Sequence, residues 1–535
     1  MKQKLLITLL LTISFSKINA QKLPYPIIFI HGLNSDDTTW NTMKNSLINN
    51  YNLTYGGRIN FCLNQDGLNS TSNLGADIQL YTSPTFTTGD FYVINFNISN
   101  NGVLYPTGSN DVLSNEAAIA KQGFALKNAI QLVLNQTNRE KVVLFGHSMG
   151  GLCAREYLQN SPNWQTDGNH HVAKLISTGT PHGGYSGSNF VFTGINSSSE
   201  AYRDLRTEYS NNNLGAYLFG GTESTNYIGT SYYNNDINCN GINNDNSTIV
   251  GLNQKNLNND VDFAYIMGNC FGCIIQGSTA GDGVVRLTNA NLGNYYNLPT
   301  PRNEFIYNAS AITEIHTDLP KQIYQNMQGL DEPNTSNLAY KVDFGNLYTG
   351  FITEQPTGGN AFDWDEYKFT VPSDGNLTLT IGRPATSEVI YVRINNSSSQ
   401  LLGQVYTIPS GSSQYSIPLT AGQYFLEING VPSTTSYLHP YSFSLNYTLS
   451  TQEFVSDISI KPYPNPTSSN VFFDNFISDF KEVIIYNYLG QEISKANFTT
   501  PSTNQEVDMR NLTSGVYLLK FSNSIKSEMV KIVKQ

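Results

Sequence analysis

The stretch Gly146-His147-Ser148-Met149-Gly150-Gly151 decides the fold of this chain. It follows an apolar run, residues 142–145, which is typical of a buried strand, and it opens a stretch with apolar residues at helical spacing. A serine hydroxyl is a weak nucleophile unless a sharp turn exposes it and a neighbouring base takes its proton. Glycines before and after the serine allow the backbone to pass through such a strand-to-helix turn. The sequence therefore predicts Ser148 as a nucleophile.

A second motif lies far upstream, where the apolar run 28–30 ends in His31-Gly32-Leu33. The tetrahedral intermediate of acyl transfer carries an oxyanion, and backbone N–H groups stabilise it. The residue after the nucleophile supplies one N–H group, and a loop after an early strand supplies the other. We therefore expect the N–H groups of Met149 and Leu33 to form an oxyanion hole, with His31 in a structural role.

His316 is the histidine best placed to act as the general base. It follows the last apolar strand of this region, residues 304–307. In an arrangement of this kind the chain order is serine, acid, histidine. The remaining histidines fall in the oxyanion loop, in the serine turn, before a strand, in a Gly-rich loop or in the C-terminal half: His31, His147, His170, His171, His182 and His439.

The acid must then lie between the serine and this histidine. Asp282 is flanked by glycines and follows the apolar run 263–267. We predict that it orients the imidazole and stabilises the imidazolium. Asp260 and Asp262 compete for this role, but they precede the same run and belong at its opposite end.

The chain is long enough for several domains. Residues 1–20 have a charged start and an apolar core that is short for a membrane span, and we expect a signal peptide there. Residues 21–330 alternate apolar strands with helical stretches, which predicts a mostly parallel sheet of the α/β class. Residues from about 185 to 260 form a long insertion rich in Asn, Ser, Tyr and Gly. Short alternating strands follow, and they predict two small all-β sandwich domains at 336–450 and 457–535.

The α/β pattern gives way to the all-β pattern at Asp331-Glu332-Pro333-Asn334, and this polar segment is predicted as a linker.

A formal charge of −11 excludes nucleic acid as a partner, because phosphate binding needs a basic surface. Five cysteines leave at least one thiol unpaired, and Cys153, at the start of an apolar helix, is the expected free one. Cys270 and Cys273 are close enough in sequence to close a small disulfide loop.

On these motifs, residues 25–320 resemble the α/β-hydrolase superfamily, and within it the bacterial triacylglycerol lipases. The resemblance implies a serine hydrolase that cleaves lipid or small esters through an acyl-enzyme and needs no cofactor for its chemistry. The insertion after Gly184 occupies the place of a lipase lid. Its polar composition departs from an apolar lid and leaves room for an esterase acting on soluble esters. The matching motifs, besides the serine turn, are His31-Gly32-Leu33, Thr180-Pro181-His182-Gly183-Gly184, Asp282-Gly283-Val284-Val285 and His316-Thr317-Asp318.

Two places suggest structural calcium. In the lipases that the chain resembles, the aspartate two residues after the histidine binds calcium, and Asp318 occupies that place; a helix cap explains it equally well. Separately, Asp236, Asn238 and Asn240 place oxygens at every second position before a glycine, as in the first half of a calcium loop. The twelfth position is Ser247 rather than a bidentate glutamate, and such runs also form plain turns.

The C-terminal segment resembles the sorting domain of the type IX secretion system, through Pro464-Asn465-Pro466-Thr467, residues 512–518 and the closing Lys531-Ile532-Val533-Lys534. This resemblance implies a secreted or surface-attached protein of a Gram-negative bacterium, with the secretion machinery as a partner. Residues 336–450 are similar to small sandwich modules that follow secreted bacterial hydrolases. Two alternatives to an esterase stay open: an amidase or thioesterase on the same three side chains, and a surface adhesin with an inactive hydrolase scaffold.

Overall fold

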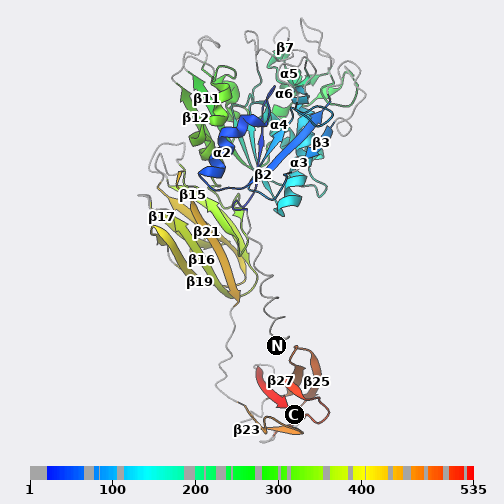
Figure 1. Cartoon of the computed structure of the whole chain (residues 1–535), viewed down its shortest axis with the longest axis vertical. Helices are drawn as coiled ribbons and strands as arrows, with labels where there is room; N and C mark the ends of the chain where they lie inside the picture. The colour runs from blue at the N-terminus through cyan, green and yellow to red at the C-terminus, as the bar shows by residue number, and fades with distance from the viewer. Residues whose placement is uncertain are drawn as a thin grey trace. The chain divides into compact units, whose positions relative to one another are not determined.

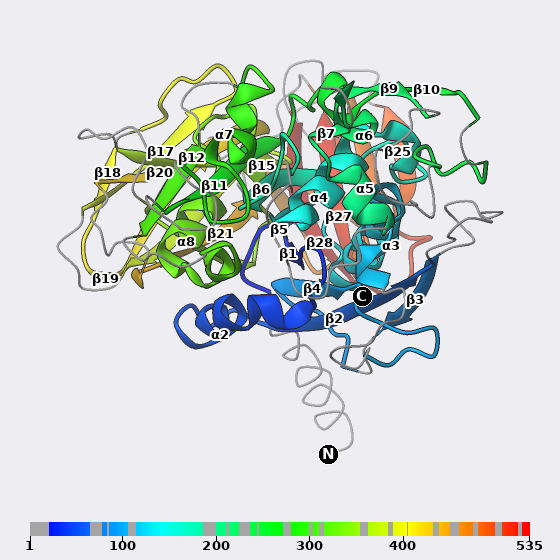
Figure 2. The same ribbon diagram turned by 90° about the horizontal axis from the view of Figure 1, so that it is seen from above.

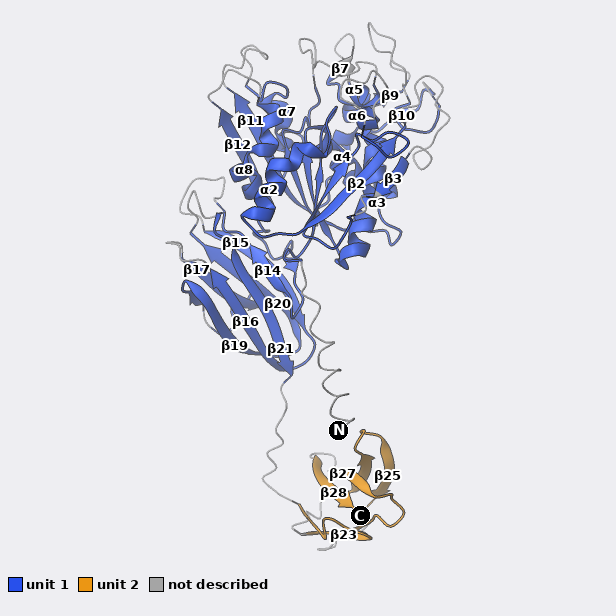
Figure 3. Ribbon diagram, viewed as in Figure 1, with its two compact units in different colours: residues 1–449 blue, residues 450–535 orange. Residues whose placement is uncertain are grey.

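The computed structural model forms two compact units, residues 1–449 and residues 450–535 (Figure 3). The expected signal peptide, residues 1–20, lies outside the described residues. The structure describes residues 21–64, 78–82, 85–104, 114–185, 199–209, 213–223, 236–242, 245–270, 280–298, 303–309, 315–353, 362–383, 389–403, 405–431, 438–449, 460–474, 480–497, 505–522 and 527–535.

The first unit contains an eight-stranded sheet in the order β12-β11-β6-β5-β1-β4-β2-β3 (Figure 1). Every neighbouring pair is parallel except the edge pair β2–β3. The central strands are short and apolar on both faces, as burial between two helical layers requires. The predicted mostly parallel sheet is confirmed. The strands are β1 (Ile27–Ile30), β2 (Tyr55–Leu63), β3 (Ile78–Thr82), β4 (Phe91–Asn95), β5 (Val142–His147), β6 (Val172–Thr178), β11 (Asp262–Cys270) and β12 (Asn303–Ala309).

Helices cover both faces of this sheet (Figure 2). On one face α3 (Ile119–Thr137) and α4 (Met149–Gln159) pack against alternate residues of the central strands, and on the other face α2 (Asn41–Asn49) and α8 (Ile323–Leu330) do the same. The serine turn thus joins the central strand β5 to a helix held in the core. Shorter elements complete this part: α5 (Glu200–Asp204), β7 (Glu208–Tyr209), β8 (Asn213–Leu214), α6 (Ala216–Phe219), β9 (Gly221–Thr222), β10 (Thr248–Ile249) and α7 (Leu287–Ala290).

A β-sandwich follows within the same unit. One sheet has the order β13-β15-β20-β17-β18 and the other β14-β21-β16-β19. Its aromatic residues join the hydrophobic core of the first sheet, where the rings of Tyr25 and Tyr340 lie 5.1 Å apart and those of Tyr51 and Phe351 5.3 Å apart. The strands are β13 (Tyr340–Lys341), β14 (Leu347–Gly350), β15 (Asp363–Val371), β16 (Gly375–Arg383), β17 (Ile390–Asn396), β18 (Tyr406–Ile408), β19 (Gly411–Leu419), β20 (Gly422–Gly430) and β21 (Tyr441–Leu449).

The second unit is also all-β, with sheets β22-β23-β26 and β25-β24-β27-β28. Val471, Phe473, Val483, Leu519 and Phe521 are buried in its separate core. Its strands are β22 (Lys461–Tyr463), β23 (Asn470–Asp474), β24 (Glu482–Asn487), β25 (Glu492–Asn497), β26 (Gln505–Asp508), β27 (Gly515–Ser522) and β28 (Ser527–Lys534).

The described cysteines and helices settle two smaller points. Cys153 is a free, buried thiol, as predicted, and Cys62 and Cys239 are also free. Cys270 is disulfide-bonded, while Cys273 lies outside the described residues. Among the helices described above, none is both long and apolar enough to cross a membrane.

Candidate active site

The serine turn has the strained geometry that its glycines predict. Ser148 adopts φ 53° and ψ −128°, a conformation that residues with a side chain rarely occupy. A Cβ atom on Gly146 would lie 2.4 Å from backbone atoms of Gly150 and Gly151. A Cβ atom on Gly150 would lie 2.5 Å from the carbonyl oxygen of Ile30. Only glycine allows β5, β1 and the start of α4 to approach this closely, and that approach exposes the serine at the end of the strand.

The structure brings the predicted serine, histidine and aspartate together. Nε2 of His316 lies 2.9 Å from Oγ of Ser148, and Nδ1 of His316 lies 2.7 Å from Oδ2 of Asp282. Asp282 is fully buried and His316 is 4% exposed, so water does not compete for the contact between them. These distances permit proton transfer from the hydroxyl to the imidazole.

The carboxylate of Asp282 is fixed from its other side. Its Oδ1 accepts hydrogen bonds from the N–H groups of Val284, at 2.9 Å, and Val285, at 2.6 Å. Its carbonyl oxygen accepts from the N–H groups of Ile315 and His316. The loop after β11 therefore positions both the carboxylate and the backbone of the histidine. We did not predict the two valine N–H donors, although an Asp-Gly turn commonly accepts such bonds.

His147 supports His316 without reaching the serine. Its Nε2 lies 3.0 Å from the carbonyl oxygen of His316, and the two rings have centroids 4.9 Å apart. Burial, together with the neighbouring His316, holds the pKa of His147 well below its usual value. A neutral His147 therefore donates to that carbonyl and helps to hold the histidine loop. The sequence indicated only that His147 lies in the serine turn.

The predicted oxyanion loop lies against the serine. A Cβ atom on Gly32 would lie 2.7 Å from Cβ of Ser148, and Leu33 lines the same cavity as the serine. His31 is structural, as expected: Nε2 accepts from the N–H of Phe96, and Nδ1 donates to the carbonyl oxygen of Gly32. Met149 begins α4, where the N–H group has no partner within the helix.

A cavity of about 350 Å³ opens above Ser148 and His316. This volume is near the lower end of the range for small-molecule sites. The segment 34–42 contributes polar residues to its lining: Asn34, Ser35, Thr38, Thr39 and Thr42. The segments 181–185, 202–205 and 284–285 contribute mainly apolar and aromatic residues: Pro181, Tyr185, Tyr202, Leu205, Val284 and Val285. A larger cavity, about 890 Å³, is lined by other residues and contains none of the three predicted side chains.

The competing acids lie elsewhere. Asp260 is exposed and contacts His170, with both carboxylate oxygens 3.2 Å from Nε2. Asp262 forms an ion pair with Lys174 at 2.8 Å. Neither carboxylate is near the serine turn, because both precede the body of β11 and so stand at the opposite edge of the sheet.

The two candidate calcium positions have local partners. The carboxylate of Asp318 forms a half-exposed ion pair with Lys321 at 2.7 Å. The side-chain oxygens of Asp236, Asn238 and Asn240 accept hydrogen bonds from backbone N–H groups of their own loop. Neither position belongs to a group of three or more acidic, histidine or cysteine side chains that meet around one point, as far as the described residues show.

Comparison with known families agrees with this architecture. Residues 25–193 match the family model for the alpha/beta hydrolase fold, and residues 461–535 match that for the secretion system C-terminal sorting domain. The chain contains an α/β-hydrolase fold domain and a type IX secretion sorting domain. The hydrolase match includes Ser148 but ends before Asp282 and His316, which the geometry above adds.

No curated protein matches the chain significantly. Among solved structures, the lin2722 gene product of Listeria innocua is 16% identical, with 58% of this chain and 95% of that one covered and a TM-score of 0.34. Naproxen esterase (carboxylesterase NP) of Bacillus subtilis is 11% identical, with 57% and 84% covered and a TM-score of 0.24. The pre-peptidase C-terminal domain of collagenase from Bacillus anthracis is 14% identical, with 22% and 99% covered and a TM-score of 0.16. Likenesses this low carry no argument about substrate.

The match to the sorting domain indicates the cellular location of the protein. It points to a secreted or cell-surface protein that interacts with the type IX machinery.

Proposed function

We propose that this protein is a secreted serine hydrolase of a Gram-negative bacterium that cleaves carboxylic esters. The observation that carries the proposal is the hydrogen-bonded series Ser148–His316–Asp282, with distances of 2.9 and 2.7 Å, in which Ser148 and His316 line a cavity. A serine, a histidine and a buried carboxylate in this geometry are the elements of nucleophilic acyl transfer. The chemistry needs no cofactor.

The first half of the reaction forms an acyl-enzyme. Oγ of Ser148 attacks the ester carbonyl carbon while Nε2 of His316 takes the hydroxyl proton. The N–H groups of Leu33 and Met149 donate to the oxyanion of the tetrahedral intermediate. The imidazolium then protonates the departing alkoxide, and the acyl group remains on Ser148.

The second half releases the acid. Nε2 of His316 takes a proton from water, the resulting hydroxide attacks the acyl carbon, and the proton returns to Oγ of Ser148. The buried carboxylate of Asp282 stabilises the imidazolium in both halves and holds its Nδ1–H.

The cavity supports a preference for short acyl chains over long ones. Its volume is about 350 Å³, and part of its lining carries hydroxyl and amide groups. Long apolar chains gain about 0.8 kcal/mol per methylene only while each methylene is buried. We therefore infer an esterase acting on short-chain or soluble esters.

Hydrolysis of a series of p-nitrophenyl esters, from acetate to palmitate, tests this proposal. We expect turnover to peak at a short acyl chain, and Ser148→Ala to lower kcat by at least about 10⁴-fold. Ser161→Ala, an exposed serine outside the cavity, is the matched control and should leave kcat unchanged. Full activity of Ser148→Ala would contradict the assignment of Ser148 as the nucleophile. Wild-type turnover of amides or thioesters, but of no ester, would contradict the substrate class.

A further inference from the structure

A group of acidic side chains is buried at the contact between the hydrolase domain and the β-sandwich. Asp331 and Glu332 follow the end of α8, and Asp363 and Asp365 stand on β15. The residues on β15 are two apart, so their side chains share one face of the strand. All four are buried, with Asp363 and Asp365 fully inaccessible to solvent. The segment 331–334, which we predicted as a linker, is thus part of the interior.

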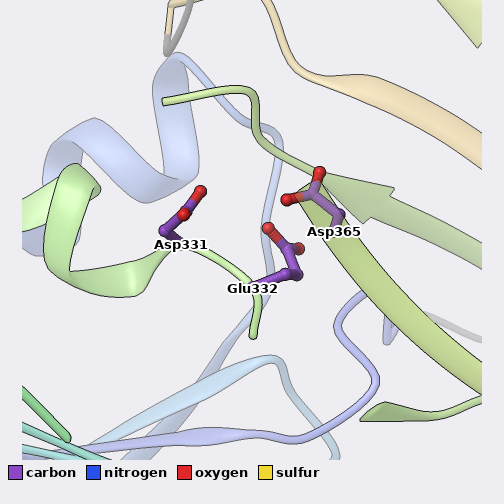
Figure 4. A group of neighbouring side chains, drawn as sticks. All are labelled: Asp331, Glu332 and Asp365. Atoms are coloured by element: carbon purple, nitrogen blue, oxygen red, sulfur yellow. The ribbon is translucent and has the colours of Figure 1, made fainter. Parts of the chain in front are cut away.

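The carboxylates converge on one point. One oxygen each from Asp331, Glu332 and Asp365 lies within 4.8 Å of the other two. Figure 4 shows Glu332 and Asp365 with their carboxylates facing each other, the first from the segment after α8 and the second from the strand. Oxygens that share a calcium ion, each 2.3–2.6 Å from it, lie at most about 5 Å apart.

Neutral donors reach this acidic group, namely the N–H of Phe351 on Glu332 and the N–H of Thr353 on Asp363, but they supply no positive charge. Oδ2 of Asp365 accepts from the hydroxyl of Tyr441 at 2.5 Å, but Oδ1 is buried without a hydrogen-bond partner in the described part of the chain. Lys174 is the nearby cation, and its Nζ contacts the carbonyl oxygen of Asp331 and the carboxylate of Asp262. One side chain of this convergent acidic group, Asp365, therefore carries a buried carboxylate oxygen without a hydrogen-bond partner among the described residues.

Burial of several carboxylates together destabilises the fold unless they are neutralised. Burial and the neighbouring Asp331 raise the pKa of Glu332 to about 8. Burial, and then the charges of Asp363, Glu332 and Asp331, raise the pKa of Asp365 well above its usual value. A bound divalent cation removes this cost without protonation.

The chemistry of the group favours calcium. All the side chains that meet there offer oxygen, and none offers nitrogen or sulfur, as zinc and copper sites prefer. Calcium accepts irregular sets of carboxylate and carbonyl oxygens, whereas magnesium demands a near-regular octahedron. A secreted protein also meets calcium at the concentrations that extracellular sites require.

We propose that Asp331, Glu332 and Asp365, with Asp363 beside them, bind one calcium ion that joins the hydrolase domain to the β-sandwich. The ion takes ligands from both parts and so holds the end of α8 against β15. This site is separate from Asp318 and from the loop that contains Asp236, and it does not depend on the proposed ester hydrolysis.

Calcium titration of the metal-depleted full chain tests the site, with heat of binding and Tm as readouts. We expect calcium at about 100 times its dissociation constant to raise the Tm of the wild type by about 3 °C, because the unit that holds the ion is large. Asp365→Asn should bind one ion fewer and lose this rise. Without calcium, Asp365→Asn should be at least as stable as the wild type at pH 7.5, because it removes the cost of burying or protonating this carboxyl; a merely structural role would lower its stability.

Asp318→Asn and Asp236→Asn are the controls, and both should keep the rise in Tm. If Asp365→Asn does not fold, Glu332→Gln gives the same comparison. The proposal is overturned if millimolar calcium leaves the wild-type Tm unchanged, if Asp365→Asn and Glu332→Gln keep the full number of bound ions, or if Asp236→Asn or Asp318→Asn alone abolishes the rise.

Discussion

Replacing Asp282 with asparagine tests how this carboxylate controls the histidine. Oδ1 of the aspartate accepts two backbone N–H bonds, from Val284 and Val285. In the variant, the amide oxygen must occupy that position. The opposite orientation would set the NH₂ group against two N–H donors and leave both without an acceptor, at about 1–3 kcal/mol each.

The NH₂ group of the variant therefore faces Nδ1 of His316, at the place of an oxygen that lies 2.7 Å away in the wild type. It donates to Nδ1, so the neutral imidazole must carry its proton on Nε2, the nitrogen 2.9 Å from Oγ of Ser148. A protonated Nε2 cannot accept the proton of the serine. An imposed wrong tautomer lowers kcat by about 10⁴-fold in serine hydrolases, which corresponds to about 5.5 kcal/mol in activation free energy.

Steady-state hydrolysis of p-nitrophenyl butyrate, with Tm measured alongside, checks this expectation. The variant keeps the shape and hydrogen bonds of the aspartate, so its Tm should remain close to that of the wild type while kcat collapses. Asp260→Asn, at the competing acid paired with His170, should stay within about twofold of the wild type. A loss of less than tenfold in Asp282→Asn, or an equal loss in Asp260→Asn, would refute the assignment of the acid.

Two further predictions concern stability. Burial raises the pKa of Glu156, whose carboxylate accepts a hydrogen bond from the hydroxyl of Tyr217. The folded state therefore binds the proton of this carboxyl more tightly than the unfolded state does. The stability that protonated Glu156 gives to the fold is fully present below about pH 4.3 and is lost as the pH rises through the folded-state pKa. Glu156→Gln should therefore gain Tm relative to the wild type as the pH rises from 4 to 8, and a difference that is constant with pH or shrinks would disprove this. Gly146→Ala places a Cβ atom 2.4 Å from backbone atoms and should abolish folding or activity. Gly168→Ala meets nothing within 4 Å and is strained only by its positive φ, so it should lower the free energy of unfolding by about 1–2 kcal/mol. Similar Tm values for the two variants would contradict the packing argument.

The sequence was sufficient to predict the parallel sheet and to select the three side chains that the structure brings together. Local motifs carry this information, because the turn at Ser148 needs glycines and the order of the three residues follows the order of the strands. The strand β2 was not predicted. It contains two glycines and an irregular register near Tyr55, which interrupt the apolar pattern, yet tertiary packing buries most of it.

Contacts between distant segments were harder to predict. The bond from His147 to the carbonyl of His316 depends on how two loops meet at the sheet edge, and no local pattern records it. Asp331 and Glu332 have the polar composition of a linker, but the core shared between the hydrolase domain and the sandwich buries them. Composition indicates solvent exposure only where no second domain covers the segment.

The central claim is that Ser148 is an activated nucleophile, and covalent trapping tests it most directly. The full chain would be treated with an alkyl fluorophosphonate, which phosphonylates an activated serine, and the modified peptide identified by mass spectrometry. We predict one adduct per chain, on Ser148, and none in Ser148→Ala; Asp282→Asn should react far more slowly. An unmodified wild-type chain, or an adduct on a different serine, would contradict the account.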